Sequence, residues 1–161
     1  MKKDVVQLVI FQLGGELFAA DVFAVERVLR YTAPSSVPGV PRWIEGVMPY
    51  RNTVIPVVDM RHRIELPDAP IVPETRILVF AATGGWIGAI VDSVSEIAVV
   101  PAASVTPPPA LFHGLPAQFM RGIAKLGERV VVVLDIDRVL SSTDRLEFNR
   151  IVETLEPALR G

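Results

Sequence analysis

The fold is decided by the stretch GVMPYRNTVIPVVD, residues 46–59, which returns later in the chain as GIAKLGERVVVVLD, residues 122–135. Each stretch starts at a glycine, crosses a polar turn and ends in an apolar run closed by aspartate. β-Branched side chains favour strands, and the polar pairs Arg51-Asn52 and Gly127-Glu128 stand where a hairpin would turn. The two stretches therefore predict two equivalent β-hairpins.

The similarity extends beyond these stretches, which indicates an internal duplication. Phe11 and Gly14-Gly15 have counterparts in Phe80 and Gly84-Gly85, in the same order. Each Gly-Gly pair separates two apolar runs and permits the positive φ of a tight hairpin. Two barrel-like lobes that share one core are expected, because barrel closure removes exposed strand edges. The strands are expected near Val5–Leu13, Glu16–Val22, Glu26–Tyr31, Ile44–Tyr50, Thr53–Asp59, Arg76–Ala82, Trp86–Val91, Glu96–Val100, Met120–Leu126 and Arg129–Leu134.

The composition is typical of one globular unit. The 161 residues are 50% hydrophobic and 21% charged, with a net charge of −2 and no cysteine. A chain of this length buries about 70% of its unfolded surface. The lack of cysteine excludes disulfides and thiolate catalysis, and a pI near 5.7 argues against a protein that coats nucleic acid. No signal peptide is evident and no apolar run reaches the ~20 residues of a spanning helix, so a cytoplasmic protein is expected.

Two segments fall outside the duplication. Residues 102–118 contain Thr106-Pro107-Pro108-Pro109, which predicts a stiff, extended loop. Residues 143–160 are expected to form a C-terminal helix, because their apolar side chains follow helical spacing. The single apolar stripe favours docking on the body of the protein, with contact to a partner as the alternative.

Catalytic chemistry finds little support in the sequence. His62 and His113 are its two histidines, and neither has a metal-ligand partner at helical or hairpin spacing. No phosphate-binding glycine loop or nucleophile elbow is present, and neither a metal nor a cofactor is expected. Four aspartates follow or sit inside apolar strands, where this residue typically caps the next turn: Asp21, Asp59, Asp92 and Asp135.

These observations favour a protein-binding module over an enzyme. One alternative is a small hydrolase that pairs Asp92 or Asp135 with His62 or His113. A second alternative is a free-standing peptide-binding β-barrel.

Several motifs occur in a fixed order from about residue 5 to residue 140. They are LVIFQLGG at 8–15, PVVDMR at 56–61, IVDSVSEI at 90–97 and the stretch at 122–135. In this ordered set the chain resembles the CheW family, the adaptors of bacterial chemosensory arrays. The resemblance implies an all-β domain with minor α, in which two five-stranded SH3-like β-barrel lobes share a hydrophobic core. The domain would span residues 5–140, with intertwined lobes at approximately 5–73 and 74–140.

The resemblance also implies a function. The chain would be a non-catalytic adaptor between the cytoplasmic tip of a chemoreceptor (a methyl-accepting chemotaxis protein) and the regulatory domain of a CheA-type histidine kinase. The pathway would be chemotaxis, or a surface-sensing or pilus-linked system. The adaptor would be cytoplasmic and recruited to receptor arrays at the inner membrane, without inserting into the membrane or binding nucleic acid.

The family's receptor hairpin packs into an apolar groove between the two barrels. Carried over by motif, the residues of this receptor-binding groove are Val25, Arg27, Val28, Arg51, Asn52 and Val54. The proline loop would contribute to the kinase and adaptor ring through Thr106, Pro109, Leu111 and Phe112.

The chain departs from the family pattern at two positions. The turn written Asn-Leu-Arg-Gly in the family reads Pro49-Tyr50-Arg51-Asn52, and Arg27 replaces a glutamate, with Glu26 one position earlier. Asn still permits positive φ, so the hairpin should survive. A reversed charge at a contact changes partner choice. We therefore expect a receptor or kinase that differs from the standard motility set.

Overall fold

The computed structural model describes residues 4–40, 43–82, 85–107 and 119–139. The helix predicted at residues 143–160 lies outside these ranges. Within them, no helix is both long enough and apolar enough to cross a membrane.

The described chain consists almost entirely of strands, which confirms the expected all-β class with minor α. All ten expected strands are present close to their expected bounds. They are β1 (Val5–Leu13), β2 (Glu16–Asp21), β3 (Val25–Arg30), β4 (Ile44–Tyr50), β5 (Thr53–Asp59), β6 (Arg76–Ala82), β7 (Gly85–Val91), β8 (Ser93–Pro101), β9 (Met120–Leu126) and β10 (Arg129–Leu134). Short helical turns follow some of them: η1 (Val22–Ala24), α1 (Met60–Arg63), η2 (Ala102–Ser104) and, after β10, α2 (Ile136–Val139).

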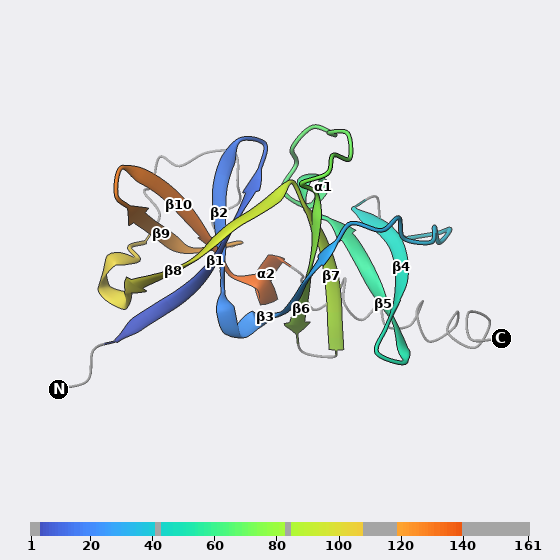
Figure 1. The fold of residues 1–161 in the computed structure, drawn as a ribbon, viewed down its shortest axis with the longest axis horizontal. Coiled ribbons are helices and arrows are strands. Elements are labelled where there is room, and N and C mark those ends of the chain that lie inside the picture. The colour runs from blue at the N-terminus through green and yellow to red at the C-terminus, as the bar shows by residue number, and fades with distance from the viewer. Residues whose placement is uncertain (1–3, 41–42, 83–84, 108–118, 140–161) are drawn as a thin grey trace.

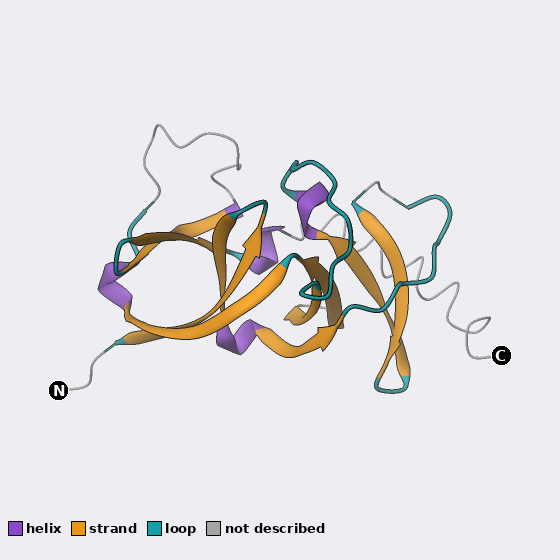
Figure 2. Ribbon diagram, turned by 45° about the horizontal axis from the view of Figure 1, so that its top comes forward, coloured by secondary structure: helices purple, strands orange, loops and turns teal. Residues whose placement is uncertain are grey.

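The strands form two five-stranded sheets that make two lobes lying side by side (Figure 1). Lobe A has the strand order β8-β1-β2-β10-β9, and lobe B has the order β3-β6-β7-β5-β4. In each lobe two antiparallel hairpins meet through one parallel contact, between β2 and β10 in lobe A and between β7 and β5 in lobe B. The strands of lobe A curl around its interior (Figure 2).

The lobes do not divide the chain at the expected boundaries of 5–73 and 74–140. Lobe A combines β1 and β2 with β8, β9 and β10, whereas β3 to β7 all belong to lobe B. The two copies of the repeat have therefore exchanged their first hairpins, and the chain crosses between lobes after β2 and again after β7. Sequence similarity shows which residues are equivalent, but it does not show which hairpins pair in space.

One hydrophobic core runs through both lobes. Phe11 and Phe18 of lobe A stack with their ring centroids 6.2 Å apart, and they belong to the same buried cluster as Leu78 and Phe80 of lobe B. Leu134 at the end of β10 completes this contact between the sheets. Each lobe also has buried clusters of its own, but this shared cluster is covered only when both lobes are folded.

Residues 46–59 and 122–135 fold as equivalent hairpins, within β4–β5 and β9–β10. Gly46 and Gly122 each lie against a passing backbone segment. A Cβ at Gly46 would stand 2.0 Å from Ser35 O, and one at Gly122 would stand 2.6 Å from Thr106 O. The close approach allows Ser35 and Thr106 each to donate a backbone hydrogen bond of 2.9 Å to the residue after the glycine.

The aspartates that end these hairpins cap the following turns, as predicted. Asp59 Oδ1 accepts hydrogen bonds from the backbone N–H groups of Arg61, at 2.9 Å, and His62, at 3.4 Å. Asp135 Oδ1 accepts one from the N–H of Arg138 at 3.3 Å. These caps set the start of α1 and α2, because a side-chain acceptor satisfies N–H groups that have no partner in the first turn.

Candidate functional site

The six residues predicted to bind a receptor lie on β3, an edge strand of lobe B, and on the β4–β5 hairpin. Val28 is 43% exposed, and Arg27 and Asn52 are exposed. Val25 packs against the shared core, and Val54 is half-buried. Val28 is therefore the aliphatic member of the set most available to a partner.

An ion pair joins the two elements. Arg51 Nη1 in the β4–β5 turn lies 2.8 Å from Glu26 Oε2 on β3. The ladder between β3 and β6 pairs Val25 with Phe80 and Arg27 with Val79, so it skips Glu26. Such a bulge changes the direction of a side chain, and here the extra residue carries the carboxylate that meets Arg51. Glu26 is thus an internal partner for the turn arginine.

The turn holds the Arg51 guanidinium in a defined place. Arg51 and Asn52 have φ values of 47° and 62°, as a two-residue hairpin turn with positive φ at both centres requires. The guanidinium carbon lies 5.5 Å from the ring centroid of Tyr50 and 5.7 Å from that of Trp86. The two rings meet edge to face at 5.0 Å. Since 48% of the Arg51 side chain is still exposed, it can contact Glu26 and a partner at once.

Lobe A carries a counterpart of this surface. Ile97 on β8 pairs with Val9 in the way that Val28 pairs with Leu78, and 62% of Ile97 is exposed. Arg129 Nη2 lies 3.4 Å from Glu96 Oε1. An acid–arginine pair thus joins β8 to the β9–β10 hairpin, as the Glu26–Arg51 pair joins β3 to the β4–β5 hairpin. The counterpart offers a matched internal control for any binding test on lobe B.

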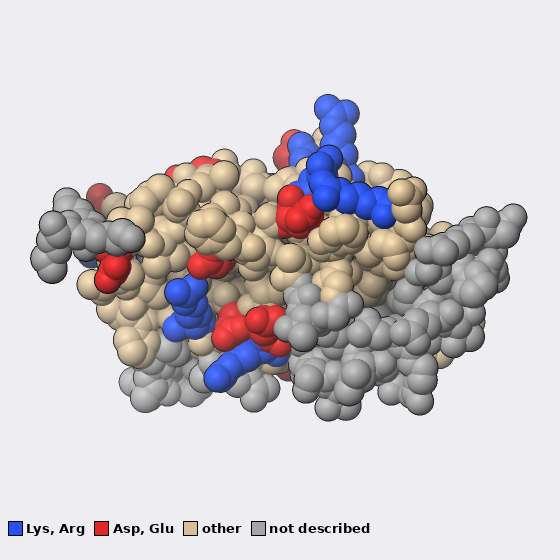
Figure 3. Space-filling model, turned by 90° about the horizontal axis from the view of Figure 1, so that it is seen from below, with Lys and Arg blue, Asp and Glu red and all other residues tan. Residues whose placement is uncertain are grey.

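A hollow of about 260 Å³ lies where the lobes meet, but it is not the expected apolar groove. None of the six predicted receptor-binding residues lines it, and Arg121 Nη1 bonds to Asp21 Oδ2 at its rim at 3.2 Å. The lining residues are Asp21, Ala24, Ala81, Arg121, Leu134, Asp135, Ile136 and Asp137. On the face seen from below, acidic and basic side chains stand in small mixed groups on a largely uncharged surface (Figure 3).

Phe23 is an exposed apolar residue that the predicted groove omitted. It lies in η1, where the chain passes between the lobes, and it is 84% exposed. Its backbone N–H donates to Asp21 Oδ1 at 2.9 Å, which fixes the turn that presents the ring. An apolar residue just after a strand is compatible with core or with an exposed patch, and the sequence alone leaves both open for Phe23.

Comparison with known proteins places the chain in a protein family. Residues 7–144 match the family model described as CheW-like domain. The chain belongs to the CheW-like family. The resemblance inferred from the ordered motifs is thereby confirmed.

Individual CheW proteins are similar over most of the chain. The chemotaxis protein CheW of Treponema pallidum is 28% identical over 142 residues, covering 86% of this chain and 84% of the relative. That of Bacillus subtilis is 30% identical over 134 residues, with 83% and 86% covered. The crystal structure of scaffolding protein TtCheW from Thermoanaerobacter tengcongensis matches with a TM-score of 0.79 at 27% identity, covering 86% of this chain and 90% of that one. The SH3-like two-lobed fold is confirmed by this likeness.

Of the residues predicted to face the kinase in this CheW-like chain, only Thr106 can be placed. It is exposed, and its backbone is bonded in both directions to Ile123 of β9. Pro109, Leu111 and Phe112 lie outside the described residues.

The histidine–aspartate pairs of the hydrolase alternative are not formed by the described residues. Asp92 accepts two hydrogen bonds from Arg61, at 2.8 and 2.5 Å, and one from the Gly14 N–H at 2.8 Å. Burial raises the pKa of Asp92, but these hydrogen bonds outweigh it and leave the pKa below its usual value. Asp135 caps α2, and His113 lies outside the described residues.

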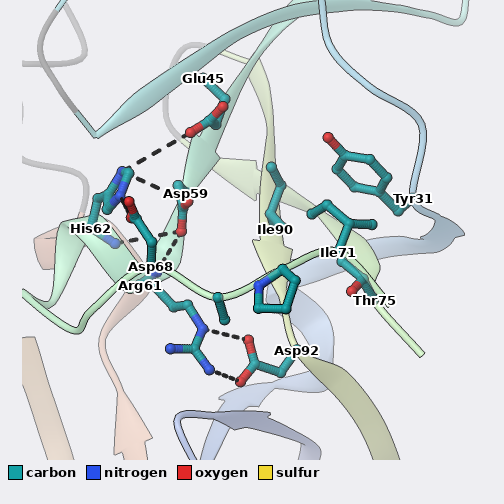
Figure 4. Close-up of a pocket in the computed structure, with 12 residues that line it drawn as sticks. Tyr31, Glu45, Asp59, Arg61, His62, Asp68, Ile71, Thr75, Ile90 and Asp92 are labelled. Carbon is teal, nitrogen blue, oxygen red and sulfur yellow. Dashed lines mark hydrogen bonds and ion pairs between the residues drawn. The ribbon is translucent and has the colours of Figure 1, made fainter. Parts of the chain in front are cut away.

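His62 instead stands among other carboxylates, which the spacing of the sequence did not predict. It lies beside Asp59, Asp68 and Glu45 at the edge of a pocket of about 290 Å³ (Figure 4). Glu45 comes from β4 and Asp59 from the end of β5, so the hairpin register brings them together. The pocket lies at the opposite end of this hairpin from the Arg51 turn.

Proposed function

We propose that this chain is a non-catalytic adaptor that couples the cytoplasmic tip of a chemoreceptor to the regulatory domain of a CheA-type histidine kinase. The match of residues 7–144 to the CheW-like domain carries this proposal. The likeness to a protein titled a scaffolding protein, across 86% of the chain, supports a binding role.

The receptor surface is proposed to be β3 together with the β4–β5 turn. Val28 supplies an exposed aliphatic anchor, and the Arg51 guanidinium supplies a charge already oriented by Glu26 and two aromatic rings. An oriented arginine loses little side-chain entropy on binding. This surface suits an apolar helical hairpin that carries an acidic group near its tip.

The kinase surface is proposed to begin at Thr106 and to include Pro109, Leu111 and Phe112. Thr106 is bonded to β9 of lobe A, whereas the proposed receptor surface belongs to lobe B. Separate surfaces allow both partners to bind one adaptor. Recruitment to receptor arrays at the inner membrane would then follow from receptor binding.

Modest affinity is enough for this role. A dissociation constant of 1 μM corresponds to about 8 kcal/mol, and repeated contacts in an array add to it through effective concentration. Removal of one good anchor typically costs on the order of 2 kcal/mol, or about 30-fold in affinity.

The receptor surface is tested by two matched substitutions. Val28→Asp should weaken binding of the receptor tip by about 30-fold in isothermal titration calorimetry, because it places a charge at the proposed anchor. Ile97→Asp makes the same change at the equivalent exposed position of lobe A, so it should leave the affinity within about twofold. Equal losses in the two folded variants, or no loss from Val28→Asp, would remove the assignment.

A charge exchange tests Arg51 separately. Arg51→Glu alone places two carboxylates together, and adding Glu26→Arg restores the internal ion pair with reversed polarity. If the receptor contacts Arg51 directly, the double variant should fold normally and still bind weakly. Recovered binding in the double variant would mean that Arg51 acts only within the adaptor.

A further inference from the structure

Glu45, Asp59 and His62 bring three metal-ligating side chains to one end of the pocket in lobe B (Figure 4). Their ligand atoms all lie within 4.8 Å of one another. His62 Nδ1 is 3.7 Å from Asp59 Oδ2 and 4.0 Å from Glu45 Oε1. These separations are too long for hydrogen bonds, which leaves a gap between the three atoms.

The two ring nitrogens of His62 have different surroundings. Nε2 pairs with the Asp68 carboxylate, which assigns the ring proton to this nitrogen in the neutral imidazole. Nδ1 is buried and has no hydrogen-bond partner. Its lone pair then faces two carboxylate oxygens, and a buried polar atom without a partner is costly. A cation in the gap would give Nδ1 the partner that it lacks and would also bind the Asp59 and Glu45 oxygens that face it.

We propose that Glu45, Asp59 and His62 bind a divalent transition-metal ion of the Zn²⁺ class. Zn²⁺ bonds to imidazole nitrogen at about 2.0–2.1 Å and to carboxylate oxygen at about 2.0–2.2 Å, so tetrahedral ligands stand about 3.4 Å apart. The separations from Nδ1, 3.7 and 4.0 Å, exceed that spacing by about 0.3 and 0.6 Å, and the ligand atoms all lie within 4.8 Å of one another. Rotations of the side chains would have to bring the three ligands together. The fourth position faces the pocket, where water can complete the tetrahedron.

The surrounding groups are those that orient metal ligands. Asp68 holds the far nitrogen of His62, which is the usual outer partner of a ligating histidine. The backbone N–H groups of Arg61 and His62 hold Asp59 Oδ1 and leave Oδ2 facing the gap. The Arg61 guanidinium makes its hydrogen bonds to Asp92 and to Pro67 O, not to the two ligand carboxylates, although its charge acts on Asp59. A neutral imidazole and two carboxylates match the charge of a dication.

Tyr31 adds evidence that negative charge is concentrated here. Burial raises the pKa of Tyr31, and the nearby charges of Glu45 and Asp59 raise it further. A bound dication would offset those charges and lower the pKa of this tyrosine. The metal would also join β4 to the β5–α1 junction, far along the hairpin from the proposed receptor surface.

The test titrates the metal-free 161-residue chain with Zn²⁺ and measures the heat of binding by isothermal titration calorimetry. One saturable site per chain is expected. His62→Gln and Glu45→Gln should each weaken it at least tenfold, and Asp68→Asn, which changes no ligand, should weaken it by about 10- to 100-fold. Glu45 lies on β4 with 37% of its side chain exposed, so its variant should fold even if a change at His62 disturbs α1. His113→Gln is the matched control and should bind Zn²⁺ as the unaltered protein does.

Nitrogen-15 spectra of the two histidines provide a second measurement. Zn²⁺ should shift Nδ1 of His62 while Nε2 keeps its proton. The proposal is overturned if no saturable site is found, or if Zn²⁺ binding is lost with His113→Gln instead of His62→Gln. It is also overturned if both His62 nitrogens carry protons at pH 7 and stay unchanged on adding Zn²⁺. The histidine would then satisfy the carboxylates as an imidazolium.

Discussion

The pairing of Arg61 with Asp92 should contribute about 2 kcal/mol to the free energy of unfolding. Asp92 lies where the chain leaves lobe B for lobe A, and it holds α1 through Arg61 and the β1–β2 turn through Gly14. The side chains of Arg61 and Asp92 are only 16% and 28% exposed. An exposed pair contributes about 0.2–1 kcal/mol, whereas hydrogen bonds to charged groups contribute about 1.5–3 kcal/mol. A two-pronged pair that is mostly buried belongs to the second class, so about 2 kcal/mol is expected.

A double-mutant cycle measures this contribution. The variants are Arg61→Met, Asp92→Asn and the double variant, each unfolded by urea at pH 7. The coupling free energy should be about 2 kcal/mol, and each single variant should melt about 6 °C lower for a chain of this length. The exposed pair Arg138–Asp135 is the control, with a coupling below about 0.5 kcal/mol.

The coupling should also depend on pH in a defined direction. The folded-state pKa of Asp92 is below the unfolded value of about 3.9, so the stabilisation is fully present above that pH. It is lost as the pH falls from there through the folded-state pKa. A coupling below about 0.5 kcal/mol at pH 7, or one that grows as the pH falls below about 4, would show that the pair does not stabilise the fold in this way.

Two further stability predictions concern the β4–β5 hairpin. Gly46→Ala should lower the free energy of unfolding, measured in urea, by about 3 kcal/mol. The new Cβ would stand 2.0 Å from Ser35 O, so the backbone would have to move. A loss under about 0.5 kcal/mol would show that the segment around Ser35 yields easily. Asn52→Val should cost about 1 kcal/mol at the positive φ of the turn, whereas Asn52→Gly should be neutral or stabilising. Equal stability of these two Asn52 variants would contradict the turn geometry.

The hairpins were predictable because their signals are local. Residues 46–59 carry a starting glycine, a turn pair and a capping aspartate, and each has the expected role in the structure. The exchange of hairpins between lobes depends instead on which apolar faces meet in the core. No run of adjacent residues records that choice.

Pro56 was predictable from its own chemistry. The missing N–H predicts that the strand is an edge at this residue or carries a bulge, and β5, although it lies between β4 and β7, is not paired with β7 at Pro56. Pro56 is tolerated because the ladder with β7 starts only at Val57, so no bond to β7 is needed one residue earlier. The irregular register falls on the partner strand instead, between Ile44 and Gly46.

The candidate site was predictable in part. Family motifs pointed to Val28 and Arg51, but the pairing of Arg51 with Glu26 depends on a bulge that composition does not show. The cluster around His62 could have been found from the hairpin register. Glu45 precedes Gly46, and Gly46 pairs with Val57, so Glu45 stands near Asp59. Asp59 in turn lies three residues before His62.

The adaptor role is tested most directly by mixing this chain with a receptor tip and a kinase regulatory domain and measuring the mass of the complexes by analytical ultracentrifugation. One species that contains all three proteins is expected, because the two partners use separate surfaces. If the receptor tip displaces the kinase domain, or if neither binds the folded chain, this chain is not an adaptor that holds both partners at once.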